Sequence, residues 1–158
     1  MTHPKVSCLI LACGNTLRGD DGVGPWLAHW VENRFREESQ VRVITRQQWT
    51  PELAEEIARA HSVLFIDCSV DSAPGSISLA PVEPTAALQG IATHHQSAAE
   101  LLALTRDLYS TKPTTAKLLT IGAGSTELGE QFSDAATAAL PEACRLIEET
   151  VSSMLSSR

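Results

Sequence analysis

The chain has 158 residues, of which 43% are hydrophobic and 20% are charged, and its formal net charge is −7 at pH 7. This length suits one domain with a buried core, and the composition argues against a disordered chain. The negative charge and the dispersed Lys and Arg residues argue against a nucleic-acid or membrane-surface partner. Without a run resembling a signal peptide or a membrane helix, the sequence predicts one cytoplasmic domain over residues 1–158, with a monomer as the default.

The first predicted strand and the first predicted helix lie on either side of a pair of carboxylates. Residues 6–12 form a short, uncharged apolar run, which is typical of a buried strand. Asp20 and Asp21 follow after a Gly-Asn turn, and residues 22–38 have the apolar spacing of an amphipathic helix. We expect both tryptophans of this helix to pack in the core.

The rest of the chain alternates between strand and helix patterns. In order, we expect a strand at 41–45, a helix at 50–60, strands at 62–66 and 76–80, a helix at 97–109, a strand at 117–121 and a helix from 133 onward. The strand at 76–80 follows its predecessor without a crossover helix, so it should run antiparallel. The pattern predicts an α/β three-layer sandwich, in which a five-stranded, mostly parallel sheet carries helices on both faces.

Two prolines mark details of the predicted helices. Thr50 precedes Pro51, and this pair suits the N-cap and first position of the helix at 50–60. Pro141 lies inside the last helix and should kink it.

The four cysteines are expected to be reduced, because no export signal and no Cys-x-x-Cys spacing are present. Cys8 and Cys144 lie in apolar patterns and should be small core residues. Cys13 and Cys68 fall at strand ends, where they could face a site. Since no nearby Lys or Arg is evident to lower a thiol pKa, structural roles are favoured for both.

Three polar positions should converge at the carboxyl edge of the sheet. Asp21 follows the first strand, Asp67 ends the third, and His94 or His95 precedes the helix at 97–109. Two carboxylates and an imidazole suit a divalent metal such as Zn²⁺, Ni²⁺ or Mn²⁺, and three protein ligands leave a position open for water or substrate.

Each of these residues also has a purely structural alternative. Asp20 or Asp21 could cap the helix that starts at Gly22, and Asp67 could form a turn. The two histidines could simply begin a helix. Other motifs give no support, because the sequence contains no Gly-x-Gly-x-x-Gly loop after a strand, no Walker A loop, no His-Glu-x-x-His and no Gly-x-Ser-x-Gly.

Several motifs together resemble those of a known family, the hydrogenase maturation endopeptidases (HybD/HyaD-like). The matching motifs, in chain order, are Gly14-Asn15-x-Leu17-x-x-Asp20-Asp21-Gly22-x-Gly24, Gln48-x-Thr50-Pro51-Glu52-Leu53, Ile66-Asp67 with Pro74-Gly75, His95-Gln96, Ile121-Gly122 and Glu127. The resemblance extends over nearly the full chain, and this ordered set is far more specific than any one fragment.

The resemblance implies a fold, an activity and a site. The fold is a twisted five-stranded sheet with one antiparallel strand between helices. The activity is removal of a short C-terminal extension from a [NiFe] hydrogenase large-subunit precursor after nickel insertion. Asp21, Asp67 and His95 match the family's metal-binding positions, with Asp21 or Asp67 as the catalytic base.

The resemblance also implies that the nickel is carried by the substrate, although other divalent metals could occupy the site in isolation. Cys68 stands where the family usually has a small residue, and its thiol could add a soft ligand. Two alternatives remain open at this point. One is a non-catalytic assembly factor that binds the nickel-loaded large subunit, and the other is a different metal-dependent hydrolase.

Overall fold

The computed structural model describes residues 5–85 and 97–157, and its centre is one five-stranded sheet with the strand order β2-β1-β3-β5-β4. The strands are β1 (Val6–Cys13), β2 (Val41–Arg46), β3 (Ala60–Ser69), β4 (Ile77–Pro81) and β5 (Thr115–Gly122). β1 pairs in parallel with β2 and β3, and β3 pairs in parallel with β5. β4 pairs antiparallel with β5, as the short connection predicts.

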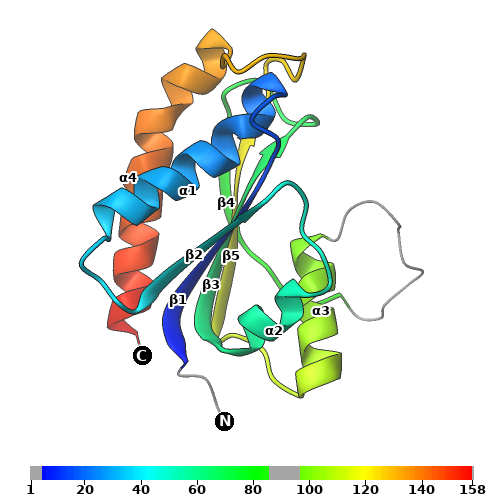
Figure 1. Ribbon diagram of the computed structural model, residues 1–158, viewed down its shortest axis with the longest axis vertical. Coiled ribbons are helices and arrows are strands. Elements are labelled where there is room, and N and C mark those ends of the chain that lie inside the picture. The colour runs from blue at the N-terminus through cyan, green and yellow to red at the C-terminus, as the bar shows by residue number, and fades with distance from the viewer. Residues whose placement is uncertain (1–4, 86–96, 158) are drawn as a thin grey trace.

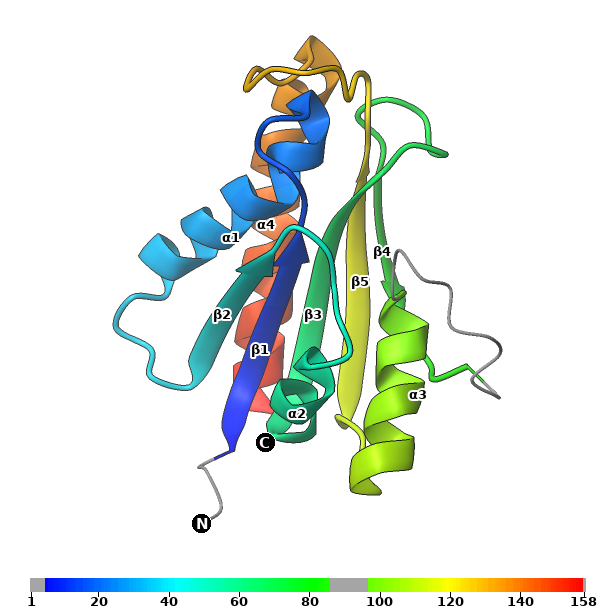
Figure 2. The ribbon, with the colours of Figure 1, turned by 45° about the vertical axis from the view of Figure 1, so that its right-hand side comes forward.

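Helices cover both faces of this sheet, so the predicted three-layer architecture is confirmed (Figures 1 and 2). The helices are α1 (Val23–Arg34), α2 (Leu53–Ala58), α3 (Ala98–Tyr109) and α4 (Asp134–Ser156), and a 3₁₀ turn, η1 (Gly19–Gly22), precedes α1. α1 and α4 lie on one face, and α2 and α3 lie on the other.

The interior strand β1 is buried on both faces, which explains its continuous apolar sequence. Cys8, Ile10 and Ala12 pack in the core under α1 and α4. Leu9 and Leu11 point to the opposite core, under α2 and α3. In that second core Trp49 and Phe65 meet edge to face with their ring centroids 5.2 Å apart. Alternate residues of β1 therefore pack against the helices on opposite faces of the sheet.

The first helix differs from its sequence prediction at both ends and in one tryptophan. α1 begins at Val23 and ends at Arg34, short of residue 38. The core expectation is wrong for Trp26, whose side chain is 43% exposed, while Trp30 is half-buried against the core. The buried stripe of α1 runs through Val23 and Leu27, four residues apart, and Trp26 lies beside it.

Two further predictions concern the start of α2 and a kink within α4. α2 begins only at Leu53, with Glu52 as its N-cap and no side-chain cap hydrogen bond, so the predicted Thr50 cap is wrong. The carbonyl of Thr50 accepts instead from the Leu53 backbone N–H at 3.1 Å, as part of a tight turn. α4 continues through Pro141 as one helix, and the expected kink stays a prediction.

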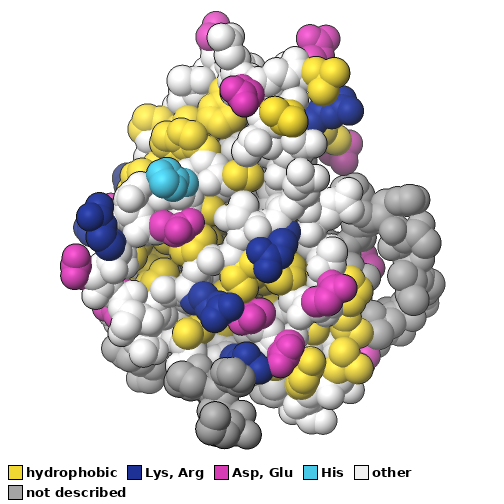
Figure 3. All heavy atoms as spheres, in the orientation of Figure 1, with side chains coloured by type: hydrophobic (Ala, Val, Ile, Leu, Met, Phe, Trp, Pro, Cys, Tyr) yellow, Lys and Arg dark blue, Asp and Glu magenta, His cyan; other side chains and the backbone are white. Residues whose placement is uncertain are grey.

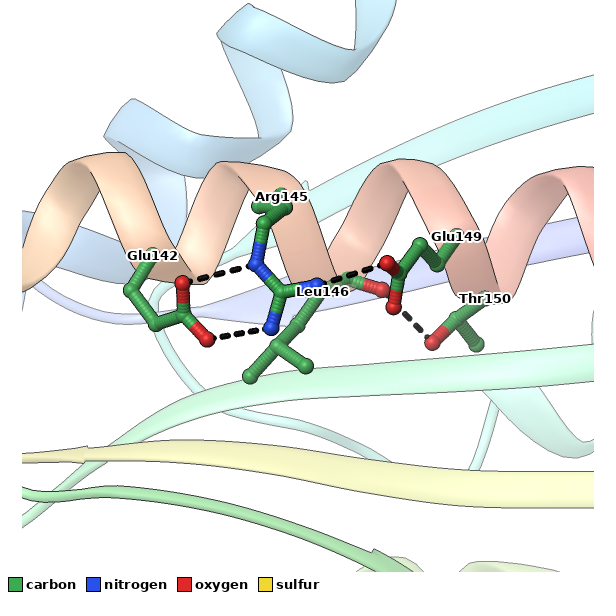
Figure 4. A network of polar contacts seen from close by, with 5 residues as sticks. All are labelled: Glu142, Arg145, Leu146, Glu149 and Thr150. Atoms are coloured by element: carbon green, nitrogen blue, oxygen red, sulfur yellow. Dashed lines mark hydrogen bonds and ion pairs between the residues drawn. The ribbon is translucent and has the colours of Figure 1, made fainter.

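The surface shown in Figure 3 intersperses acidic and basic side chains. On α4, Arg145 lies between Glu142 and Glu149 and donates hydrogen bonds to both (Figure 4). These side chains are about half-exposed, so such pairs contribute little to stability. None of the helices within residues 5–85 and 97–157 combines the length and the apolar composition of a membrane span.

Candidate functional site

A pocket of about 340 Å³ lies where the carboxyl ends of β1 and β3 meet. Its lining comprises Cys13, Gly14, Asp21, Gln47, Gln48, Asp67, Cys68 and Val70. β1 and β3 are parallel neighbours with Ala12 opposite Ile66, so both strands deliver their last residues to the same edge. Ligands of open α/β sheets bind at this edge. Asp21 and Asp67 are 46 positions apart in the sequence, and the structure brings both to one pocket.

Asp21 lies in η1 and is oriented by the turn that follows β1. Its Oδ2 accepts a 2.7 Å hydrogen bond from the backbone N–H of Asn15. The alternative that Asp21 or Asp20 caps α1 is wrong, because the N-cap of α1 is Gly22 and no side chain caps it. Asp21 is half-buried, so part of the carboxylate is available to the pocket.

Asp67 lies within β3, which continues to Ser69, so the turn-forming alternative is wrong. Its Oδ1 accepts a 2.7 Å hydrogen bond from the backbone N–H of Cys68. The side chain is half-buried and lines the same pocket as Asp21. A carboxylate on a paired strand has a more fixed position than one on a loop, because the ladder holds its backbone.

Both pocket carboxylates affect the pKa values of two neighbouring thiols, Cys13 and Cys68. Burial, together with the charge and a hydrogen bond of Asp67 and the charge of Asp21, raises the pKa of Cys13 far above its ordinary value. Burial and the charges of Asp21 and Asp67 raise the pKa of Cys68 to about 12. Both thiols are therefore protonated at neutral pH and are poor nucleophiles. Their common neighbours place the two carboxylates in a single electrostatic environment.

The expected imidazole falls outside the part of the chain that the structure describes. His94 and His95 precede Ser97, the N-cap of α3, and belong to residues 86–96. Within residues 5–85 and 97–157, no three His, Cys, Asp or Glu side chains are arranged to hold a metal ion. Two of the three expected ligands, Asp21 and Asp67, lie among the described residues, and metal binding by all three stays a prediction.

The sequence pattern did not predict that Gln47 and Gln48 belong to the site, but both line the pocket. Gln47 and Gln48 directly follow β2, which is the parallel neighbour of β1 on its other side. A loop after a parallel strand lies at the same sheet edge as the other carboxyl ends, and this topology is the signal that could have identified them. Their amides add hydrogen-bond donors and acceptors to a pocket whose other polar side chains are carboxylates and thiols.

Asp20 is structural, as the sequence suggested, but its partners differ from the predicted helix cap. Its side chain is fully buried, and it accepts hydrogen bonds from Gly124, Ser125 and Ser133. Burial alone would raise the pKa of Asp20, but the hydrogen bonds from Ser133, Gly124 and Ser125 outweigh it and lower the pKa. The adjacent aspartates therefore face different surroundings, one the interior and the other the pocket.

Comparison with known proteins identifies the class of fold. No protein-family model matches the chain, and no curated protein matches its sequence. Solved structures do match. The hydrogenase maturating endopeptidase HybD from Escherichia coli superimposes with a TM-score of 0.75 at 18% identity, over 92% of each chain. The [NiFe] hydrogenase maturation protease HybD from Thermococcus kodakarensis superimposes with a TM-score of 0.62 at 23% identity, over 90% of this chain and 97% of that one.

A third structure, the hydrogenase 2 maturation peptidase from a Thaumarchaeota archaeon, gives a TM-score of 0.66 at 22% identity, over 92% of this chain and 97% of that one. The molecule is thus an α/β protein with an acidic pocket at the carboxyl edge of its sheet. Its fold is that of the hydrogenase maturation endopeptidases, as the sequence resemblance implied.

Proposed function

We propose that this protein is an endopeptidase that removes the C-terminal extension of a [NiFe] hydrogenase large-subunit precursor after nickel insertion. The observation that carries the proposal is the meeting of Asp21 and Asp67 in one pocket. The same two residues match the metal-binding acids of the family that the sequence resembles, and proteins described as hydrogenase maturation proteases share the fold.

In this proposal the nickel arrives with the substrate. Asp21, Asp67 and His95 contact the nickel already bound to the precursor, so that only a nickel-loaded large subunit is cut. Carboxylate and imidazole ligands suit Ni²⁺. Recognition of the metal thereby serves as the test that maturation is complete.

The chemical step is hydrolysis of a peptide bond. A water molecule adds its oxygen to the scissile carbonyl carbon and gives a proton to Asp21 or Asp67 acting as base. The C–N bond then breaks, and the leaving amine takes up the proton. The substrate's nickel polarises the carbonyl or the water.

The test is intact-mass spectrometry of a nickel-loaded large-subunit precursor before and after incubation with the protein. The wild-type protein should shorten the precursor at its C-terminus, and nickel-free precursor should stay uncut. Asp21→Asn and Asp67→Asn should each slow cleavage by about 100-fold or more. An asparagine at position 21 can still accept from the Asn15 backbone N–H, so the fold should persist.

The matched control is Asp107→Asn, which removes an exposed carboxylate on α3 away from the pocket lining. This variant should cleave like wild type. Cleavage by Asp21→Asn at the wild-type rate would overturn the proposal. Binding of the nickel-loaded precursor with no mass shift would also overturn it and would favour a non-catalytic assembly factor.

A further inference from the structure

The buried carboxylate of Asp20 joins two loops that are far apart in the sequence. Its Oδ2 accepts from the backbone N–H groups of Gly124 at 2.7 Å and Ser125 at 3.1 Å, and from the Ser133 hydroxyl at 2.7 Å. Its Oδ1 accepts from the Ser133 backbone N–H at 2.7 Å. These four donors are all neutral groups, and all come from the segment between β5 and α4.

Ser133 extends this contact to a helix end. It is the N-cap of α4, and its hydroxyl oxygen accepts from the Ala136 backbone N–H at 3.2 Å while its O–H donates to Asp20. A carboxylate at the N-terminus of a helix is also favoured by the helix dipole. Asp20 therefore anchors the 14–22 loop to the first turn of the longest helix.

Backbone hydrogen bonds run beside the carboxylate and join the same two loops. The N–H of Asp20 donates to the Ser125 carbonyl at 2.9 Å, and the N–H of Gly19 donates to the Gly129 carbonyl at 2.8 Å. The N–H of Gly129 donates in turn to the Leu17 carbonyl at 2.8 Å. The 14–22 loop is thus fastened to residues 124–133 at Leu17, Gly19 and Asp20.

The next residue after this anchor is Asp21. It sits in a single four-residue 3₁₀ turn, η1, and such a short turn has little stability of its own. One oxygen of Asp21 is held by the Asn15 N–H, and the backbone that carries Asp21 is held by Asp20. The four donors around Asp20 hold its carboxylate in one orientation, which gives the turn before Asp21 a defined geometry.

We propose that Asp20 is a positioning residue, which fastens the 14–22 loop to residues 124–133 and so fixes Asp21 in the pocket. The proposal rests on the proposed function for its catalytic consequence, but not for its structural one. Asp20 does not touch the substrate, because its side chain is fully buried. It acts through the position of Asp21.

Two variants weaken the anchor by different amounts. In Asp20→Asn the carbonyl oxygen can keep the three donors at Oδ2, but the NH₂ group then faces the Ser133 backbone N–H. In Ser133→Ala one of the four hydrogen bonds and the cap of α4 are lost. The matched control is Ile147→Val, which trims a fully buried side chain on α4 far along the helix from Ser133 and should lower stability to a similar extent as a lost cap does.

The first measurement is independent of activity. The Asn15 backbone N–H is bonded to Asp21, so its hydrogen exchange reports whether Asp21 stays in place. Exchange at Asn15 should be faster by about tenfold or more in Asp20→Asn and Ser133→Ala, and unchanged in Ile147→Val. If exchange at Asn15 were unchanged in both Asp20→Asn and Ser133→Ala, the proposal would be overturned. If Asp20→Asn does not fold, the exchange measured in Ser133→Ala is the test.

The second measurement is cleavage of the nickel-loaded precursor at a temperature where all variants are folded. Both anchor variants should lower kcat by about tenfold to 100-fold, with KM changed less than about threefold, because only the reacting geometry is disturbed. Ile147→Val should keep kcat. Equal kcat in the anchor variants and in Ile147→Val would reduce Asp20 to a stability residue and overturn the proposal. Absence of cleavage by wild type would instead overturn the proposed function and leave the exchange result to decide on Asp20.

Discussion

Gly24, in the first turn of α1, lies directly against the last residue of β1. A Cβ atom at Gly24 would stand 2.3 Å from the carbonyl oxygen of Cys13, closer than real Cβ contacts come. Because Cys13 lines the pocket and α1 follows Asp21, this close approach sets the distance between the strand end and the helix start. The absence of a side chain at position 24 is therefore a condition for the pocket.

Gly24→Ala should destabilise the protein, because the added methyl group meets a backbone atom that cannot rotate away. Overpacking of this kind costs about 1–3 kcal/mol, and here α1 must also move relative to β1. Urea unfolding measures the loss. Ser153→Ala, an exposed substitution on α4, is the control and should change the free energy of unfolding by less than about 0.5 kcal/mol. Equal stability of the two variants would contradict the packing at Gly24.

The thiol of Cys8 should make the protein sensitive to alkaline pH. Cys8, on β1, is fully buried against Met154 of α4, and burial raises its pKa from 9.0 to about 12. Between these values the unfolded chain loses the thiol proton while the folded chain keeps it, so the free energy of unfolding falls as pH rises. Over this range wild type should lose about 1.4 kcal/mol per pH unit more than Cys8→Ala.

The measurement is urea unfolding of both proteins between pH 9 and 11, in which the other titrating groups cancel in the difference. Cys144→Ala is the comparison variant. Its thiol is only half-buried, and burial raises its pKa less, so a smaller difference is expected. If the free energy of unfolding fell equally with pH in wild type and in Cys8→Ala, the raised pKa of the Cys8 thiol would be contradicted.

Trp49 should contribute to stability through its ring and not through its indole N–H. The side chain is buried and packs edge to face on Phe65, and its Nε1 has no hydrogen-bond partner among the described residues. Trp49→Phe keeps an aromatic ring and removes an unpaired donor, so it should cost less than about 1 kcal/mol. Trp49→Ala should cost about 3–5 kcal/mol in urea unfolding. If Phe proved as harmful as Ala, the indole N–H would have to be paired.

The two pocket carboxylates should act as one unit in cleavage. If Asp21 and Asp67 hold the same substrate-borne metal, loss of either breaks the site, and loss of the second costs little more. The double variant Asp21→Asn/Asp67→Asn should therefore cleave the nickel-loaded precursor within about tenfold of the slower single variant. Single-turnover rates by mass spectrometry measure this. If the rate loss of the double variant equalled the two single losses multiplied together, the carboxylates would act independently of each other.

The sequence by itself determined the layer architecture and the strand directions. Periodicity separates strands from helices, and the short link before β4 leaves room only for an antiparallel return, so both were predictable from local pattern. The candidate acids were predictable as well, because Asp21 and Asp67 follow or end apolar strand patterns whose carboxyl ends share an edge.

The family resemblance assigned the metal to Asp21, but only the tertiary structure showed which groups hold Asp20 away from the pocket. Both aspartates follow the same strand, and local pattern treats each as a helix cap. The choice depends on Gly124, Ser125 and Ser133, donors more than 100 positions away that surround Asp20 and leave Asp21 to the pocket. The exposure of Trp26 was decided in the same way, by which stripe of α1 meets the sheet. Local sequence sets which conformations a segment can adopt, while burial and hydrogen-bond partners depend on distant parts of the chain.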